Sequence, residues 1–556
     1  MTARPTPVTA TVRSNKSMND TVVNATYTEE AARLVASIDQ DPWGSVRPSL
    51  YETARVISAA PWLSGEPRRI AYVLNEQAPD GSWGEGPERY RLLPTLSGVE
   101  AAVAVLRRGG TSEETARRLT TAVDSGLAAL RALPSAGPWP DTAAAEILVP
   151  SLVAKIHEQL TLIGDDPPPS AGDWRPGPAP ALPGGYDRAV PAYVAKRYAS
   201  AGGLPVKLHH TFEGVAGCIP GALIPDGPDL LGSSPAATAA RAAASQEPPA
   251  ATVAALEAVA RRYSGLFPEA APILVFERLW VAAALAGAHL PAAAVPTVRE
   301  WATDLYDPRG VRGAPGLMTD ADDTAMAVLV SSLVGLDDHT PDPLDLFHNG
   351  SHYDCYIGED TGSVTANAHA LQALGSYLRR HPGARHTYGP RTEKLSDWLV
   401  GQQRPEGPWP DKWHASPYYA TARCVAALSR HGGDRAAPAV ETAVAWTIDT
   451  QRDDGSWGIW GGTTEETAYA ARILLSAADP RPGHAPALDR ALDRALDRAE
   501  TYLHEGAGSG HHPALWHDKT LYAPGAMIEA EVLAARELLR TRHGLNGRNT
   551  PTDAER

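Results

Sequence analysis

Three aspartates lie within four positions of the segment Thr319–Leu329 (TDADDTAMAVL), and small and apolar residues follow them directly. The segment contains no basic residue that could neutralise Asp320, Asp322 and Asp323. Three kinds of site fit this pattern: a metal site, a solvated helix N-terminus, or a carboxylic acid kept protonated for chemistry. Because clustered carboxyl groups cannot all ionise cheaply, at least one of the three is expected to retain its proton at neutral pH.

A side-chain carboxylic acid that keeps its proton could donate it to an isolated carbon–carbon double bond. This step makes a tertiary carbocation, so it requires a strong acid and the exclusion of water. Aspartic acid is the strongest neutral acid among the ordinary side chains, with a pKa of about 3.9. Hydrogen bonds from neighbouring groups can stabilise the carboxylate that remains after the transfer.

Two further segments could take part in such a site. Thr365 and His369 are four residues apart in a helical pattern (VTANAHAL), so they are expected to share one face of a helix. The second segment, 335–345 (GLDDHTPDPLD), is rich in aspartate but lies among prolines and has no matching second metal motif. We interpret it as an acidic loop.

The elements that must position these residues are predicted to be helices. Apolar residues recur at intervals of three to four, and convincing alternating strands are absent. A repeat with the pattern Gln-x-x-Asp-Gly-Ser-Trp-Gly separates some of these helices. It occurs at 76–84 and 450–458, with a degenerate copy at 402–409. An Asp-Gly turn flanked by glutamine and tryptophan can tie successive helices together, as a closed helical array requires.

Size and composition exclude several classes of protein. The 556 residues suffice for two or three domains, and the net charge of −15 argues against a nucleic-acid-binding surface. No apolar run is long enough to cross a membrane. The three cysteines are far apart and indicate buried thiols in a reducing compartment. We therefore expect a cytoplasmic protein without stable membrane insertion, and we expect disordered tails at 1–24 and 546–556.

The aspartate cluster and the tryptophan repeats together resemble the class II terpene cyclases, most nearly the copalyl diphosphate synthases and their bacterial relatives. Shorter segments in the same order extend the resemblance over about 49–522. These are PSLYETA (48–54), RLLPTL (91–96), EILVPSL (146–152), KLHHTFEG (207–214), SPAATAA (234–240), FERLW (276–280) and WHDKTLY (516–522).

The resemblance implies an all-α fold of two (α/α) barrels, called β and γ, with the active cavity between them. The γ barrel is expected at 45–285, inserted after the first helix of the β barrel. The β barrel is expected to comprise 25–44 and 286–545. The third, class I domain of many plant relatives would need a longer chain.

The implied activity is that of an isomerase (an intramolecular lyase). It would convert geranylgeranyl diphosphate to copalyl diphosphate, of the ent type, with the diphosphate retained and a class I terpene synthase acting downstream. The alternatives are a rearranged halimane or clerodane diphosphate, drimenyl diphosphate made from farnesyl diphosphate, and a non-catalytic (α/α)-barrel isoprenoid-binding protein. The oligomeric state is not predicted.

For the acid, the resemblance implies that Asp322 donates the proton, that Asp320 and Asp323 position it, and that Thr365 and His369 hydrogen-bond it.

For the final deprotonation, the resemblance places His210 where plant relatives use a histidine that holds the water accepting the proton. Ser264 falls where those relatives have an asparagine. This departure leaves the deprotonation site and the product skeleton open.

Substrate contacts are also implied by the resemblance. The carbocation would be stabilised by cation–π contacts, and Mg²⁺ would help to bind the diphosphate. The expected aromatic residues are Trp280, Trp413, Tyr419 and Trp457, the expected basic residues are Lys519, Lys196 and Arg197, and the expected metal ligand is Glu146.

Overall fold

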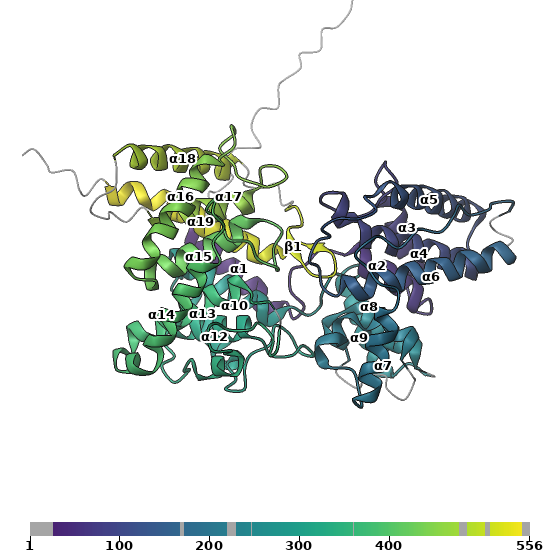
Figure 1. Ribbon diagram of the computed structural model, residues 1–556, viewed down its shortest axis with the longest axis horizontal. Helices are drawn as coiled ribbons and strands as arrows, with labels where there is room; N and C mark the ends of the chain where they lie inside the picture. Colours follow the sequence, from purple (N-terminus) through teal and green to yellow (C-terminus); the bar gives the residue numbers. More distant parts are fainter. Residues whose placement is uncertain are drawn as a thin grey trace, which may run out of the picture.

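Helices build two lobes that lie side by side in the computed structural model (Figure 1). The structure describes residues 26–166, 172–219, 229–245, 247–359, 361–477, 486–505 and 512–546. The expected tail at 1–24, and the tail at 546–556 beyond Asn546, lie outside these residues. Within them the strands are confined to one short antiparallel hairpin, β1 (Trp516–His517) and β2 (Leu521–Tyr522), which lies between the lobes. No described helix is long and apolar enough to span a membrane.

The larger lobe is a ring of helices in which each contacts the next and the last returns to the first. The inner ring consists of α10 (Leu274–Ala288), α12 (Ala321–Val334), α13 (Val364–Arg380), α15 (Pro417–His431), α17 (Thr464–Ala477) and α19 (Gly525–Asn546). Outer helices pack between successive inner ones. They are α1 (Tyr27–Gln40), α11 (Val295–Leu305), α14 (Arg385–Gly401), α16 (Ala437–Asp449) and α18 (Pro486–Glu505). This arrangement is an (α/α) barrel.

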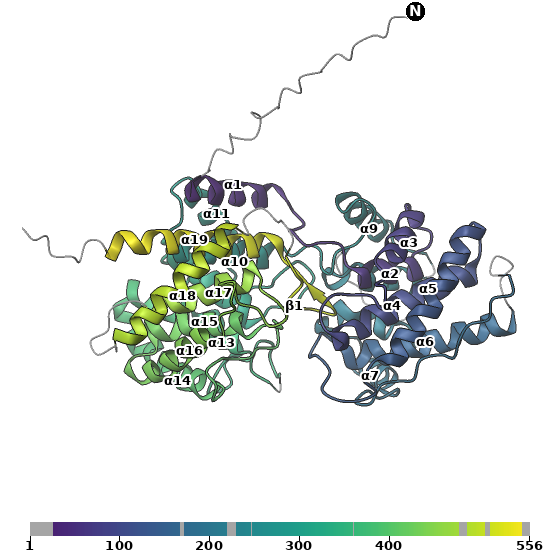
Figure 2. The ribbon, with the colours of Figure 1, turned by 90° about the horizontal axis from the view of Figure 1, so that it is seen from above.

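The smaller lobe closes in the same way around a second core (Figure 2). Its inner ring contains α2 (Leu50–Ala59), α4 (Leu92–Arg108), α6 (Ala145–Asp165), the 3₁₀ segment η3 (Val206–Gly214) and α8 (Pro235–Ala244). Its outer helices are α3 (Glu66–Asn75), α5 (Glu113–Ala132), α7 (Val190–Ser200) and α9 (Ala250–Arg262). The all-α class with two (α/α) barrels is confirmed.

The division between the lobes differs from the predicted boundary at 285. Helix α10 packs against α12 and α19, and its residues Leu279, Trp280 and Leu285 belong to the core of the larger barrel. The boundary therefore lies before α10. Helix α1, from the predicted N-terminal piece of the β barrel, also packs in the larger core, against α10 and α19. Hydrophobic periodicity identifies α10 as a helix but does not say which of two apolar cores it joins.

The tryptophan repeats form one clasp in three copies. In each copy the indole N–H donates to a carbonyl ten residues earlier at 2.7 Å, and the glutamine amide donates to the glycine carbonyl of the turn and to an outer helix. The glutamines are Gln77, Gln403 and Gln451, and they reach α5, α16 and α18 respectively. Each clasp therefore ties one outer helix to the next.

The aspartate cluster begins α12 because Asp320 is its N-cap. The Asp320 carboxylate accepts the backbone N–H of Asp323 at 2.7 Å, which satisfies one of the free donors at the helix start. The small and apolar residues that follow are buried on nearly every side, as expected for a helix in the inner ring. Gly335, with φ of 77°, ends the helix in the left-handed conformation.

The hairpin between the lobes docks the larger barrel onto the smaller one. Its residue Lys519 is 1% exposed, and its ammonium donates to Glu52 at 2.6 Å, to Ser234 at 2.7 Å and to Glu213 at 2.9 Å. All three partners belong to the smaller lobe. Lys519 is therefore an inter-lobe anchor rather than the phosphate contact that was expected.

Candidate active site

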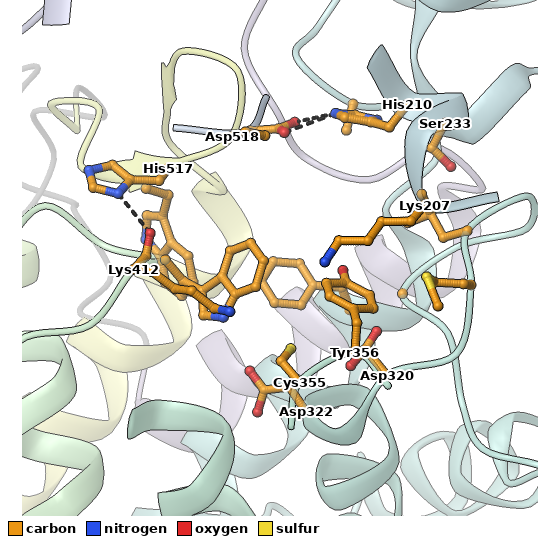
Figure 3. Close-up of a pocket in the computed structure, with 18 of the residues that line it drawn as sticks. Lys207, His210, Ser233, Asp320, Asp322, Cys355, Tyr356, Lys412, His517 and Asp518 are labelled. Atoms are coloured by element: carbon orange, nitrogen blue, oxygen red, sulfur yellow. Dashed lines mark hydrogen bonds and ion pairs between the residues drawn. The ribbon is translucent and has the colours of Figure 1, made fainter. Parts of the chain in front are cut away.

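A cavity of about 450 Å³ lies between the two barrels (Figure 3). The larger barrel contributes the start of α12, one face of α10, residues within 355–359, Thr361 and the β1–β2 hairpin. The smaller barrel contributes the start of α6 and part of η3. Residues far apart in the sequence therefore form one site.

Asp322 lines this cavity and bonds directly to His369. The distance between Asp322 Oδ1 and His369 Nδ1 is 2.6 Å, and the imidazole is 1% exposed. His369 Nε2 is buried and has no hydrogen-bond partner in the described part of the chain. Since a buried N–H without an acceptor is costly, we assign the imidazole proton to Nδ1, from which it donates to Asp322. The second oxygen of Asp322 is then available to carry an acidic proton.

Burial favours the protonated form of the other two carboxyl groups. Burial, together with the neighbouring Asp323 carboxyl, raises the pKa of Asp320 well above its usual value. Burial raises the pKa of Asp323 to about 7. The cluster therefore carries fewer than three negative charges at neutral pH, as expected from its sequence.

Thr365 lines the cavity, but its hydroxyl donates to Asp411 at 2.9 Å rather than to Asp322. The other oxygen of Asp411 accepts the backbone N–H of Val364 at 2.8 Å, at the start of α13. Asp411 therefore fixes the N-terminus of α13, the helix that carries His369. The expected hydrogen bond from Thr365 to the acid is absent, and the positioning role of Asp411 was missed because nothing in its local sequence marks it.

Aromatic side chains form much of the cavity wall, as a carbocation would require. Trp280 donates its indole N–H to the Tyr419 hydroxyl at 2.9 Å, and its ring lies edge-on to His369 with centroids 5.3 Å apart. The expected residues Trp280, Trp413 and Tyr419 line the cavity, together with Phe276, Tyr356, Trp516 and Tyr522, which the sequence did not single out. Trp457 does not line it, because its indole is fully buried in a clasp.

His210 also lines the cavity, where it is paired with Asp518 across the two lobes. His210 Nε2 lies 2.9 and 3.0 Å from the two carboxylate oxygens, and Nδ1 lies 2.6 Å from the carbonyl oxygen of Gly232. Burial alone would lower the pKa of His210, but the Asp518 carboxylate outweighs it and raises that pKa. Ser264 is exposed and does not line the cavity, so it is no partner for His210.

Two lysines of the cavity are candidates for holding an anion. Lys207, from the smaller lobe, and Lys412, from the larger, share the carboxylate of Glu359 at 2.9 and 2.7 Å. The two lysines carry two positive charges and Glu359 carries one negative charge, so this group has a net charge of +1 beside the cavity. Lys196 and Arg197 are exposed on α7 and do not line it, and neither does the buried Lys519. Sequence alone did not distinguish these lysines from the others.

Glu146 lies on the cavity wall at the start of α6, and its carboxylate makes no hydrogen bond or ion pair with the described residues. Asp141 is a second carboxylate of the same wall. No cluster of three metal-binding side chains exists among the residues that the structure describes. One or two carboxylates suit Mg²⁺ when phosphate oxygens and water supply its other ligands, so this donor set fits the metal.

Comparisons with known proteins show which proteins this chain resembles. The family model of the squalene-hopene cyclase C-terminal domain matches residues 352–480. A copalyl diphosphate synthase of Streptomyces anulatus is 77% identical and covers 100% of both chains. A copalyl diphosphate synthase of Streptomyces cyslabdanicus is 55% identical over 93% of this chain and 96% of its own. The solved ent-copalyl diphosphate synthase from Streptomyces platensis is 40% identical, covers 92% of this chain and 99% of its own, and has a TM-score of 0.82.

Proposed function

Because the chain belongs to the class II diterpene cyclases of the copalyl diphosphate synthase type, we propose that it cyclises geranylgeranyl diphosphate to copalyl diphosphate. The observation that carries this proposal is the Asp322–His369 pair at the wall of an aromatic cavity. A neutral carboxylic acid backed by a hydrogen-bond donor and facing π-electron-rich walls suits the protonation of an alkene.

The reaction begins when Asp322 gives its proton to the terminal double bond of the substrate. The π electrons of that bond form the new C–H bond, and the neighbouring double bonds then close two rings. His369 Nδ1–H stabilises the Asp322 carboxylate that remains, since hydrogen bonds to charged groups contribute about 1.5–3 kcal/mol. The faces of Trp280 and Tyr419 stabilise the cation. Loss of one proton from the bicyclic cation leaves the alkene, and the C–O bond to the diphosphate stays intact.

Lys207 and Lys412 are placed to hold the diphosphate at the other end of the substrate, where Glu146 would bind Mg²⁺. Bound Mg²⁺ would neutralise part of the diphosphate charge. Because the product keeps its diphosphate, the class of reaction that consumes it is ionisation by a class I terpene synthase. The three unpaired thiols, of which Cys355 and Cys424 are buried and Cys218 is exposed, suit a reducing cytoplasm.

The test is to incubate purified protein and Mg²⁺ with geranylgeranyl or farnesyl diphosphate and to identify the products after dephosphorylation. We expect copalol from the C20 substrate, and less of it after chelation of the metal. A drimane alcohol formed preferentially from the C15 substrate, or a halimane or clerodane skeleton, would support the corresponding alternative. Absence of any product from either would support an isoprenoid-binding protein. Chiral chromatography against both enantiomers of copalol tests the expected ent configuration.

A further inference from the structure

The hydrogen bonds around His210 determine its protonation state. A carbonyl oxygen can only accept, so the 2.6 Å contact with Gly232 requires a proton on His210 Nδ1. Nε2 faces both oxygens of Asp518, at 2.9 and 3.0 Å. Their mutual attraction outweighs burial, lowers the pKa of Asp518 and raises that of His210, so the carboxylate is ionised and can also only accept. Both ring nitrogens therefore donate, and His210 is an imidazolium without a free lone pair.

An imidazolium cannot accept the last proton of the cyclisation. The partner can: Asp518 keeps lone pairs on both carboxylate oxygens, lines the cavity and is partly exposed to it. We propose that Asp518 is the base that ends the reaction, with His210 as the positioning residue that keeps it ionised and oriented. This inference rests on the proposed function of the site.

The step balances as follows. A C–H bond next to the cationic carbon of the bicyclic intermediate breaks, and its electron pair becomes the new C=C bond. The proton goes to a carboxylate oxygen of Asp518, which is thereby neutralised, while His210 stays protonated. The cycle closes when Asp518 releases its proton to solvent and Asp322 is reprotonated from solvent.

A carboxylate paired with a cation is a weak base, but a strong base is not needed here. The His210 cation and its hydrogen bond outweigh burial and hold the pKa of Asp518 below its usual value. A carbocation is a far stronger acid than any carboxylic acid, so the transfer is still downhill. The ion pair also holds both oxygens within 3.0 Å of Nε2, which restrains the carboxylate from attacking the cation and forming an ester.

The placement of the pair also suits a base. In Figure 3 Asp518 and His210 lie on the side of the cavity opposite Asp322, with aromatic rings between them. An acid and a base in contact would exchange their proton, so separation is necessary for both to be active. The side chains of Lys519 and Glu269 make their hydrogen bonds elsewhere: the Lys519 ammonium donates to Glu52 and Glu213, and Glu269 accepts from Thr520. The positive charge of Lys519 adds to that of His210 in lowering the pKa of Asp518.

The decisive variant is Asp518→Asn, which keeps the shape of the side chain but removes its charge and basicity. We expect substrate consumption to stay within about tenfold of the wild type, because Asp322 still starts the reaction. The share of the wild-type product should fall at least about tenfold in favour of water-captured, hydroxylated diphosphates or isomeric alkenes. Asp518→Asn that yields the wild-type product alone would overturn the proposal.

A second variant, His210→Gln, separates the two possible bases and decides the question even if Asp518→Asn does not fold. The glutamine amide can still donate a hydrogen bond to Asp518 and keep the carboxylate oriented, but it cannot accept a proton as a base. If Asp518 is the base, the main product therefore survives in His210→Gln. A changed product in His210→Gln would assign the base to His210 and overturn the proposal.

Glu269→Gln is the matched control, since Glu269 is a buried carboxylate that docks the same hairpin through Thr520 but does not line the cavity. We expect it to give the wild-type product. The same product shift in Glu269→Gln as in Asp518→Asn would trace the effect to hairpin docking and overturn the proposal. The product of the wild type tests the proposed function separately, because the variants are compared with whatever the wild type makes.

Discussion

In the proposed mechanism, the proton that Asp322 donates to the substrate starts the reaction. Asp322→Asn keeps the size of the side chain and can still accept from His369, but it has no acidic proton. We expect cyclisation to fall by at least about 10²–10⁴-fold, the range typical of a lost general acid, with the fold retained. Turnover is measured as product formed per enzyme, and folding by circular dichroism and melting temperature.

Asp337→Asn is the matched control, because Asp337 lies just beyond the same helix, paired with Arg380 at the surface. Its activity should equal that of the wild type. Near-normal turnover in Asp322→Asn would exclude Asp322 as the acid.

In the same proposed mechanism, the hydrogen bond from His369 stabilises the carboxylate that Asp322 becomes after proton transfer. His369→Ala removes the donor and leaves Asp322 less acidic. With about 1.5–3 kcal/mol for a hydrogen bond to a charged group, we expect kcat to fall about 10–100-fold while KM changes little. Steady-state kinetics measure both constants. A raised KM at unchanged kcat would instead assign His369 to substrate binding.

The buried carboxyl of Asp323 predicts a specific dependence of stability on pH. The folded protein holds its proton up to a pKa of about 7, whereas the unfolded chain releases it near 3.8. Between these values the folded state binds more protons, so this group makes the free energy of unfolding fall as pH rises from about 4 to about 7. At 1.36 kcal/mol per pKa unit the loss is up to about 4 kcal/mol.

Asp323→Asn removes this titration, so its advantage over the wild type in unfolding free energy should grow from pH 4 to pH 8. Urea unfolding at both pH values measures it. Parallel pH curves for the two proteins would show that Asp323 is already ionised in the fold.

Among the elements, the clasps hold the outer helices in place. Gln403 donates to the Gly407 carbonyl at 2.7 Å and to the Ala439 carbonyl of α16 at 2.8 Å. Gln403→Ala removes one hydrogen-bond donor from each of these carbonyls, so we expect the free energy of unfolding to fall by about 1–3 kcal/mol. The product should not change. Gln402→Ala, at the exposed neighbouring position, is the control and should leave the melting temperature near that of the wild type.

At the scale of the whole molecule, Lys519 links the two barrels through buried ion pairs with Glu52 and Glu213. Lys519→Met leaves Glu52 and Glu213 buried without their cation, and breaking such a buried pair typically costs about 3–5 kcal/mol. We expect a lower melting temperature, faster proteolysis between the lobes and a loss of total activity.

Lys412→Met is the contrasting variant, because Lys412 lines the cavity. It should raise KM while the melting temperature stays near that of the wild type. A well-folded Lys519→Met protein with a raised KM would restore Lys519 as a phosphate contact.

Much of this protein follows from short stretches of its sequence. The aspartate cluster at the start of α12, the buried apolar helix after it and the tryptophan and glycine-turn bonds of the three clasps all depend on hydrogen bonds or periodicities within about a dozen residues. Helical and turn geometry places such neighbours in the same way in any fold. The glutamine bonds that join each clasp to the next outer helix span 36 to 45 residues. The pattern of Asp320, Asp322 and Asp323 offered a helix N-terminus and a retained proton as alternatives. In the structure Asp320 caps α12, and burial raises the pKa of both Asp320 and Asp323.

Other features depend on contacts that only the tertiary structure creates. His210 and Asp518 are 308 positions apart, and Lys519 meets Glu52 across 467. Which lysine reaches the cavity, whether Thr365 faces Asp322 or Asp411, and which core α10 joins all depend on how the two barrels pack. A lysine or aspartate has the same local signature whether it docks a domain or faces a substrate, because its role depends on charges brought near it by distant parts of the chain.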